Sequence, residues 1–382
     1  MIAAFDMTFT QTRRWIVLGG LATSAASCAP AVISSVSGTE RISCEIVPDS
    51  VGAHGFDPVA HQAVLETFEE SEANFHGLAI WRAGAQIAER YRMGQDSSVG
   101  RQAAVVSFDV CTLHDVRSIS KSVVSLLWGI ADGRGETPPL DTTVLSLYPE
   151  LVDLARDGRE AITIKHLLTM STGLEWNEEQ YGSLSNPETA LFWRTSQVRH
   201  TLRQRVSAPP GQIFNYCGGN TAILADLLIR YTGRALPEYA DEHLFAPLGV
   251  RHWEWVCDYR GRPLAFAGLR LTPRDLLKIG RLVLTRGAYE GRAVVPTRWV
   301  DEATSVQMAT GDGLHYGYQW WLGEVAARGE DHSYVAGFGN GGQRLFVVPS
   351  LDLVVAMTAG NYGEPEQRLS NVLFRQIAAS LI

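Results

Sequence analysis

Hydrophobic positions along this chain of 382 residues change their spacing twice. Near both ends they alternate with polar positions, which predicts strands, and in the middle they recur at helical spacing. The predicted strands cover 78–81, 86–91, 104–110, 318–322, 343–348 and 352–358. The predicted helices cover 57–70, 164–170, 190–194, 220–231, 236–244, 273–284 and 366–381. One further helix, apolar on nearly every face, is predicted to start near Ser118 and to end at Asp132-Gly133.

Strands at both ends of the chain with helices between them predict an α+β fold. We expect the terminal segments, about 55–115 and 305–382, to share one antiparallel sheet flanked by terminal helices. Residues of about 116–304 would form an all-helical lobe, so that 55–382 make one enzyme-sized domain. A seam between two lobes is a common place for a small-molecule pocket, and we expect the site there.

Composition narrows the functional classes. A 46% hydrophobic content is ample for a core, and a formal net charge of −8 does not favour nucleic-acid binding. Beyond the N-terminus no apolar run approaches the roughly 20 residues of a membrane-spanning helix. These features predict a protein with a sizeable hydrophobic core and do not indicate a nucleic-acid partner.

Residues 1–30 resemble a bacterial export signal. Arg13-Arg14 precedes a short apolar stretch and then small residues that end at Cys28, a pattern typical of the twin-arginine route. Cys28 stands where a lipoprotein carries its acylated cysteine, but Ala25 replaces the usual leucine, so ordinary signal-peptidase cleavage is the alternative. Residues 31–54 are predicted to be a linker. We therefore expect a periplasmic protein or a membrane-anchored lipoprotein.

Four further cysteines permit disulfides in an exported protein, namely Cys44, Cys111, Cys217 and Cys257. Four cysteines allow three pairings, and the sequence does not choose among them. No Cys-x-x-Cys or Cys/His spacing indicates a zinc site. Cys217 directly follows a candidate active-site residue, so a free thiol there is the alternative to a disulfide.

The first candidate catalytic group is a serine–lysine pair at the start of the apolar helix. Ser118 and Lys121 are three residues apart, so they lie on one helix face. The N–H groups and dipole of a helix N-terminus favour negative charge on the serine oxygen. We expect that field and desolvation to favour the neutral form of Lys121, which can act as a base. A capping serine followed by a surface-reaching lysine is the structural alternative.

Two later segments carry further candidates. Tyr216 lies on a glycine-rich loop just ahead of a predicted helix, and beside Lys121 it would lose its proton more easily and serve as general base and acid. The N–H of Gln343, together with that of Ser118, would form an oxyanion hole. The glycines at 337–342 let a backbone approach a ligand closely. A core tyrosine and a tight turn are the structural alternatives.

These three segments resemble the motifs of penicillin-recognising serine hydrolases: class C β-lactamases, DD-peptidases, family VIII carboxylesterases and 6-aminohexanoate-dimer hydrolases. Ser118-Ile119-Ser120-Lys121 matches the first motif in full, and Tyr216 matches the tyrosine of the second. The segments 164–174 and 267–276 extend the resemblance, which runs from about residue 55 to the C-terminus. It implies a helix-flanked antiparallel sheet with an all-helical lobe, and a reaction that needs no metal or organic cofactor.

Two departures from these motifs bear on the substrate. Gly218 stands where the family usually has asparagine, and Asn340 where β-lactamases carry lysine or histidine, so a strong anion-binding element is missing. This favours an esterase or amidase acting through an acyl-enzyme on Ser118. The substrate-binding residues that we expect are Asn340, Gly341, Gly342, Trp176 and Trp320. Alternatives are a DD-peptidase, a weak β-lactamase, or a non-catalytic module that binds cell-wall peptide.

Overall fold

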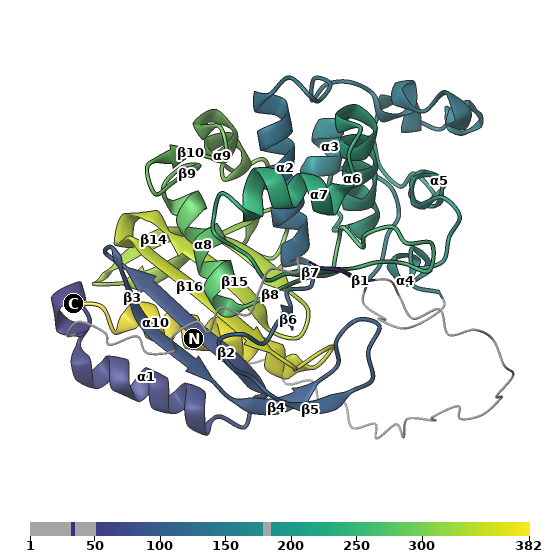
Figure 1. The fold of residues 1–382 in the computed structure, drawn as a ribbon. Coiled ribbons are helices and arrows are strands. Elements are labelled where there is room, and N and C mark those ends of the chain that lie inside the picture. The colour runs from purple at the N-terminus through teal and green to yellow at the C-terminus, as the bar shows by residue number, and fades with distance from the viewer. Residues whose placement is uncertain (1–31, 35–50, 179–184) are drawn as a thin grey trace, which may run out of the picture.

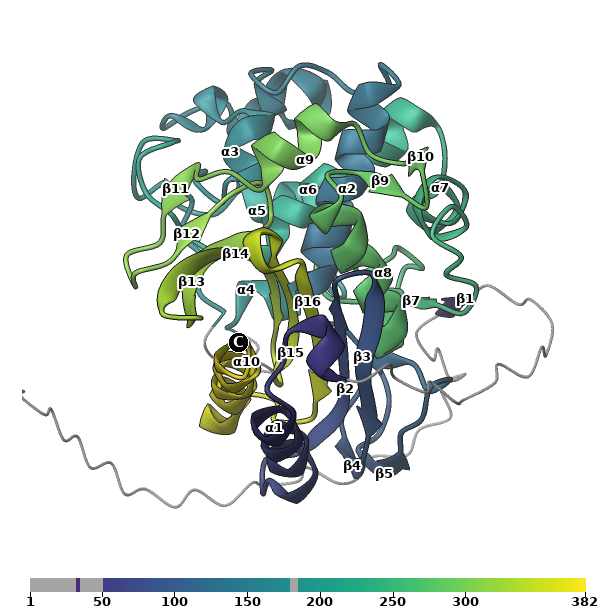
Figure 2. The same ribbon diagram turned by 90° about the vertical axis from the view of Figure 1, so that its left-hand side faces the viewer.

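The computed structural model describes residues 32–34, 51–178 and 185–382. Its centre is an eight-stranded sheet in the order β11-β12-β13-β14-β15-β16-β2-β3, with antiparallel neighbours throughout (Figures 1 and 2). The strands are β2 (Phe75–Arg82), β3 (Ala85–Tyr91), β11 (Met308–Ala309), β12 (His315–Tyr316), β13 (Trp321–Ala327), β14 (Glu330–Gly339), β15 (Gln343–Val348) and β16 (Leu353–Ala359).

The two ends of the chain meet where β16 pairs with β2. The register runs from Leu353 opposite Arg82 to Ala359 opposite Phe75. The predicted antiparallel sheet shared by both terminal segments is thus confirmed. Strand β14 was not predicted, and β13 begins at Trp321 rather than at residue 318.

Successive residues of the central strands face two separate cores. On β15, Leu345 and Val347 join one core, while Phe346 and Val348 join the other. Helices α1 (Pro58–Glu70) and α10 (Leu369–Ala379) cover the Phe346 face (Figure 2). Helices α2 (Ile119–Gly133) and α8 (Pro273–Leu284) cover the opposite face. The sheet therefore lies between two helical layers.

The helical lobe stands on the α2 side of the sheet (Figure 1). Besides α2 it contains α3 (Ile164–Leu168), α4 (Pro187–Ala190), α5 (Gln197–Leu202), α6 (Gly218–Thr232), α7 (Leu236–Ala240) and α9 (Thr297–Ala303). Helix α2 is buried from Ile119 to Ala131, as expected for a helix apolar all round. Its N-terminus points toward the sheet, so Ser118 lies at the seam between the two lobes.

Smaller elements complete the fold. One sheet has the order β1-β7-β8-β6, and the pairs β4-β5 and β9-β10 stand apart. Their strands are β1 (Val32–Ser34), β4 (Met93–Asp96), β5 (Ala104–Ser107), β6 (His114–Asp115), β7 (Glu254–Val256), β8 (Leu269–Leu271), β9 (Ala288–Tyr289) and β10 (Arg292–Ala293). Single turns of 3₁₀ or π-helix are η1 (Val51–His54), η2 (Val144–Leu147), η3 (Pro149–Leu154), η4 (Arg159–Ala161), η5 (Asp241–Phe245), η6 (Pro349–Leu351) and η7 (Pro365–Arg368).

Several predictions fall outside the described residues: the export signal with Cys28, most of the linker, and Cys44. Of the remaining cysteines, Cys217 and Cys257 are buried thiols without a disulfide. Burial raises the pKa of the Cys217 thiol well above its ordinary value, and the charge of Glu178 adds to this. Among the helices that the structure describes, none has the length and apolar content needed to span a membrane.

Candidate active site

Ser118 and Lys121 come together at the N-terminus of α2. Ser118 is the N-cap residue, and Arg117 before it has a φ of 50°, a conformation that is strained for a non-glycine residue. The side-chain nitrogen of Lys121, Nζ, lies 2.9 Å from Ser118 Oγ and 3.0 Å from the carbonyl oxygen of Phe266. Lys121 is 1% exposed. The pair therefore has the contact that proton transfer from a serine nucleophile requires.

Tyr216, two residues before α6, lies against the same pair. Its hydroxyl is hydrogen-bonded to Ser118, and Lys121 Nζ is 4.8 Å from the centre of its ring. The ring packs against Tyr316 and Trp321. Burial raises the pKa of Tyr216 well above 10, and the charge of Glu178 adds to this. The prediction that Tyr216 loses its proton more easily beside Lys121 is wrong for the free enzyme, because burial favours the neutral phenol.

Two buried glutamates complete this cluster, and the sequence analysis missed both. Glu188 Oε2 lies 3.7 Å from Lys121 Nζ, and a hydrogen bond joins its carboxyl group to that of Glu178. Glu178 also accepts hydrogen bonds from Trp176 Nε1 at 2.7 Å and from the N–H of Gly218 at 2.6 Å. Burial first, and then the charge of Glu178, raise the pKa of Glu188 well above its ordinary value. Glu188 therefore binds a proton more readily than an ordinary glutamate does.

Ser118 opens into a hollow of about 570 Å³ at the seam between the lobes. Arg117, Ser118, Glu188 and Asn340 contribute to its wall. Aromatic side chains that the sequence analysis did not select also line it, namely Phe192, Trp193, Tyr259 and Tyr362. The N–H of Ser118 donates no backbone hydrogen bond within the described part of the chain, so it remains available to a ligand. The hollow can therefore hold an acyl compound with its carbonyl group at Ser118.

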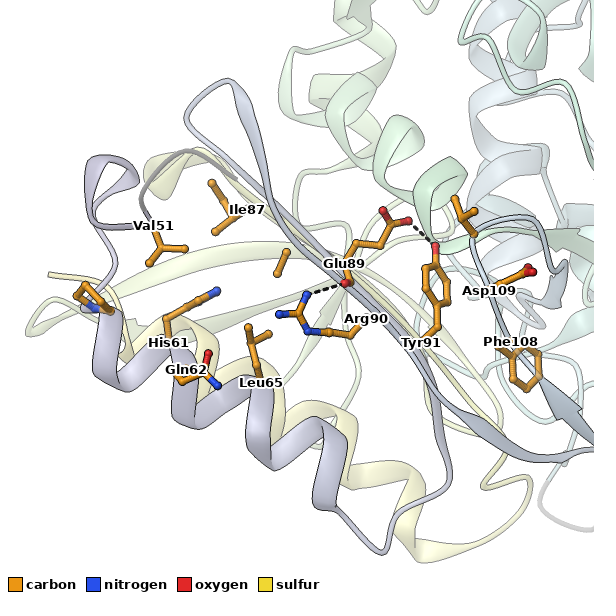
Figure 3. A pocket seen from close by; sticks show the side chains of 13 residues that line it. Val51, His61, Gln62, Leu65, Ile87, Glu89, Arg90, Tyr91, Phe108 and Asp109 are labelled. Carbon is orange, nitrogen blue, oxygen red and sulfur yellow. Dashed lines mark hydrogen bonds between the residues drawn. The ribbon is translucent and has the colours of Figure 1, made fainter. Parts of the chain in front are cut away.

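A second hollow, of about 500 Å³, lies between α1 and β3 (Figure 3). His61, Leu65, Arg90 and Tyr91 line it, and none of its lining residues lines the Ser118 hollow. Its helix, α1, covers the face of the sheet opposite to α2. It contributes nothing to the chemistry at Ser118.

Comparison with known proteins assigns the family. The beta-lactamase family model matches residues 66–379, which is most of the chain. The chain belongs to the beta-lactamase family. A 6-aminohexanoate-dimer hydrolase from Paenarthrobacter ureafaciens is 27% identical over 310 residues, covering 76% of this chain and 73% of the relative. The protein is thus a serine hydrolase, and the predicted family and enzyme class are confirmed.

Solved structures of this family share the fold. A penicillin-binding protein homologue from Caulobacter crescentus superposes with a TM-score of 0.65 at 17% identity, covering 88% of this chain and 99% of that one. A family VIII carboxylesterase superposes with a TM-score of 0.62 at 15% identity, covering 83% and 96%. These likenesses confirm the predicted helix-flanked sheet with a helical lobe.

Relative to the beta-lactamase family, the second motif is altered together with its surroundings. A Cβ atom on Gly218 would overlap Glu188 Oε2 and come within 3.2 Å of Glu178 Oε1. The space where the family carries the asparagine side chain is therefore occupied here by the two carboxyl groups. The glycine at position 218 is the one sign in the sequence that another side chain fills this space. No periodic pattern indicates that this side chain is Glu178 or Glu188.

The residues of the third motif, 340–343, do not all line the hollow. Asn340 lines the hollow, directly after the end of β14. Gln343 is fully buried, and its side-chain amide donates to Ala359 O and accepts from the N–H of Ala359. Gly341 and Gly342, with φ of 94° and 98°, form the turn between β14 and β15. Gln343, Gly341 and Gly342 are not among the residues that line the hollow.

The predicted tryptophans do not line the hollow either. Trp320 is fully buried in the core on the α2 side of the sheet. Trp176 is 7% exposed, and its indole supports Glu178. Both tryptophans are apolar and close in sequence to motif residues, which made them candidates, but they serve the packing of the lobe.

Proposed function

We propose that this protein hydrolyses an ester or amide of a small molecule through an acyl-enzyme on Ser118. The observation that carries this proposal is the 2.9 Å contact between Lys121 Nζ and Ser118 Oγ, with the Tyr216 hydroxyl bonded to the same serine. A non-catalytic binding module would have no need for a buried lysine against a serine hydroxyl at the floor of a hollow.

In the proposed reaction Ser118 Oγ attacks the carbonyl carbon while its proton moves to the neutral amine of Lys121. The raised pKa of Glu188 makes its carboxylate a good acceptor for a proton from Lys121, which leaves a neutral amine and a neutral acid in a dry site. The backbone N–H groups of Ser118 and Asn340 stabilise the negative charge that develops on the substrate oxygen. We assign this role to Asn340 rather than to Gln343 because Asn340 lines the hollow and Gln343 does not.

The proton then reaches the leaving oxygen or nitrogen through the hydroxyl of Tyr216, which stays protonated because of its raised pKa. This breaks the bond between the acyl carbon and the leaving group. Water attacks the acyl-enzyme, gives one proton back along the same path, and releases the acid and free Ser118.

The hollow favours substrates that carry an apolar group and that do not depend on a cationic side chain to bind an anionic group. Phe192, Trp193 and Tyr259 supply aromatic surface. Arg117 is the cation nearest to Ser118 in the lining, and it is engaged by Asp115 at 3.3 Å. We therefore propose an esterase or amidase rather than an efficient β-lactamase, consistent with the 6-aminohexanoate-dimer hydrolase among its relatives.

A side-by-side assay tests this proposal. A chromogenic ester, a chromogenic cephalosporin and a D-Ala-D-Ala peptide are offered to the wild type and to Ser118→Ala. We expect ester or amide turnover by the wild type and a loss of at least about a thousandfold in the variant. Intact-mass analysis after a fluorophosphonate should show one adduct, mapped to Ser118.

The outcomes separate the alternatives. Preferred cleavage of the peptide or of the cephalosporin would assign a DD-peptidase or a β-lactamase instead. Folded protein with neither turnover nor an adduct would support a binding module. Equal turnover by Ser118→Ala would refute the nucleophile.

A further inference from the structure

Two histidines and an aspartate meet in the interior outside the active site. His76 is on β2, Asp96 ends β4 and His114 begins β6. Their exposed fractions are 0%, 6% and 0%. Each offers one potential ligand atom, and these atoms all lie within 4.8 Å of one another. Three different strands thus bring metal-ligating groups to a single buried point.

The hydrogen bonds of His76 define which of its nitrogens carries a proton. Nε2 lies 3.0 Å from Asn74 Oδ1. The amide of Asn74 cannot be turned round, because its Nδ2 donates to the carbonyl oxygen of Gln95 at 2.6 Å. An amide oxygen only accepts, so Nε2 of His76 is the donor and Nδ1 keeps its lone pair.

His114 is oriented in the same way from the other side. Its Nδ1 lies 2.9 Å from the carbonyl oxygen of Asp115, which again only accepts. Nε2 of His114 therefore keeps its lone pair, and it lies 2.8 Å from Nδ1 of His76. Two lone pairs face each other, with Asp96 Oδ1 3.8 Å from His114 Nε2. A hydrogen bond between the rings would require one of them to give up its bond to a carbonyl oxygen.

We propose that His76, Asp96 and His114 bind one divalent transition-metal ion, with Zn²⁺ as the best-matched species. Imidazole and carboxylate ligands suit Zn²⁺, and a ligating histidine usually donates its other N–H to a carbonyl or carboxylate oxygen, as both rings do here. Bonds of about 2.0–2.1 Å in a tetrahedral site place two nitrogens about 3.3 Å apart, so the rings need to separate by only about half an ångström.

The surroundings supply an entry path and hold the proposed ligands in place. A hollow of about 430 Å³ is lined by Asp96, Ser98 and Phe108, so it reaches the carboxylate of the cluster. Ser98 Oγ donates to Asp96 Oδ2 at 2.5 Å, and the Tyr362 hydroxyl donates to Oδ1 at 2.7 Å. The ring of Phe108 stacks on His76, with centroids 4.2 Å apart. The carboxylate and one imidazole are thus held in place before an ion arrives.

The role of the ion is structural. His114 lies four residues before Ser118, on the strand that leads to α2. Tyr362, bonded to Asp96, lines the substrate hollow, and the guanidinium of Arg117 lies 4.3 Å from the centre of its ring. The ion would join β2, β4 and β6 and so hold one wall of the Ser118 hollow, without taking part in the reaction.

Metal binding by the full-length protein tests this site. Protein treated with a chelator and dialysed is titrated with Zn²⁺ and with Co²⁺, and bound metal is measured by elemental analysis. We expect one equivalent of either ion per chain, a higher Tm with Zn²⁺, and visible absorption of Co²⁺ in low-symmetry coordination. Asp96→Asn and His114→Gln should weaken the Kd for Zn²⁺ by at least about tenfold.

His61→Gln is the matched control, because His61 is equally buried but lies on α1 at the other hollow (Figure 3). It should retain full uptake. Absence of stoichiometric uptake by the wild type, or equal uptake by both cluster variants, would overturn the proposal and leave a proton shared by the two rings. If a cluster variant does not fold, X-ray absorption of the zinc-loaded wild type decides: two imidazole ligands support the site, and fewer overturn it.

Discussion

Glu188 is the residue that distinguishes the chemistry of this site. Its carboxyl group is buried, lies 3.7 Å from Lys121 Nζ and is bonded to Glu178, and these surroundings raise its pKa. A carboxyl group with a raised pKa binds a proton at a pH where an ordinary glutamate would not. Close to a lysine that must be neutral to act, such a group takes up the proton that the lysine gives up.

Glu188→Gln tests this role. The amide keeps the shape of the side chain but cannot accept the proton, so Lys121 would have to release it to solvent, which becomes easier as the pH rises. We expect kcat/KM at neutral pH to fall roughly tenfold to a hundredfold, and the acidic limb of the pH profile to move to higher pH. A pH series of kcat/KM measures both effects.

Glu175→Gln is the control for Glu188→Gln, because Glu175 is on the same segment of chain but pairs with Arg205 at the surface. Its pH profile should match that of the wild type. A Glu188→Gln enzyme with an unchanged profile, or with a uniform loss at every pH, would show that Glu188 only fills space.

Residue identity predicted the nucleophile and its lysine but not their neighbours. Ser118, Lys121 and Tyr216 stand in recognisable phrases, and the structure brings all three together. The carboxyl groups beside them come from a segment without periodicity. The raised pKa of Tyr216 comes first from burial, which only the assembled lobe produces, and then from the charge of Glu178.

At the scale of elements, the N-terminus of α6 packs closely against the carboxyl groups of Glu178 and Glu188. Gly218 is the first residue of α6 and leaves no room for a side chain beside Glu188. We expect Gly218→Ala to lower the free energy of unfolding by about 1–3 kcal/mol, because the added methyl group must displace a buried carboxyl group. Urea unfolding measures the loss, and the activity should fall with it.

Gly52→Ala is the control for Gly218→Ala, since the nearest atom to a Cβ there is 3.8 Å away. It should leave the free energy of unfolding nearly unchanged. Combining Gly218→Ala with Glu188→Ala should restore part of the lost stability. Equal losses in the single and the double variant would mean that the methyl group does not meet Glu188.

Regular spacing of hydrophobic residues predicted best those helices and strands that have a clear apolar pattern. Strand β15 and helix α8 have the predicted bounds. Strand β14 was missed because its first half is polar and its second half is glycine-rich, so it shows little alternation. On α1, Val59 is 80% exposed while His61 is buried, so apolar identity alone does not define the face on which this helix docks.

At the scale of the whole molecule, the sheet unites the two ends of the chain and places α2 between them. The pairing of β16 with β2 brings residues near 80 beside residues near 355, and α2 packs on the resulting sheet. The hollow at Ser118 therefore has walls from both the early and the late parts of the chain. Such a site forms only when the complete domain has folded.

Export itself is testable with the full-length protein in a bacterial host that has the twin-arginine system. Replacing Arg13 and Arg14 with lysine removes the paired arginines that such a signal requires. We expect the variant to accumulate in the cytoplasm, while the wild type reaches the periplasm or the membrane. Cell fractionation followed by an esterase assay of each fraction measures the distribution, and Arg156→Lys, at a side chain that is 70% exposed, is the control.

If the protein is exported as we predict, Cys28→Ala distinguishes a lipid-anchored form from a released one. If Cys28 is acylated, the wild type stays with the membrane fraction and the variant becomes releasable, because one or more acyl chains provide the anchor. If an ordinary signal peptidase cleaves nearby, both proteins are released and both have the mass of the same shortened chain, apart from any difference at residue 28. If the variant with lysine at positions 13 and 14 is still exported normally, the twin-arginine assignment is refuted, whatever the state of Cys28.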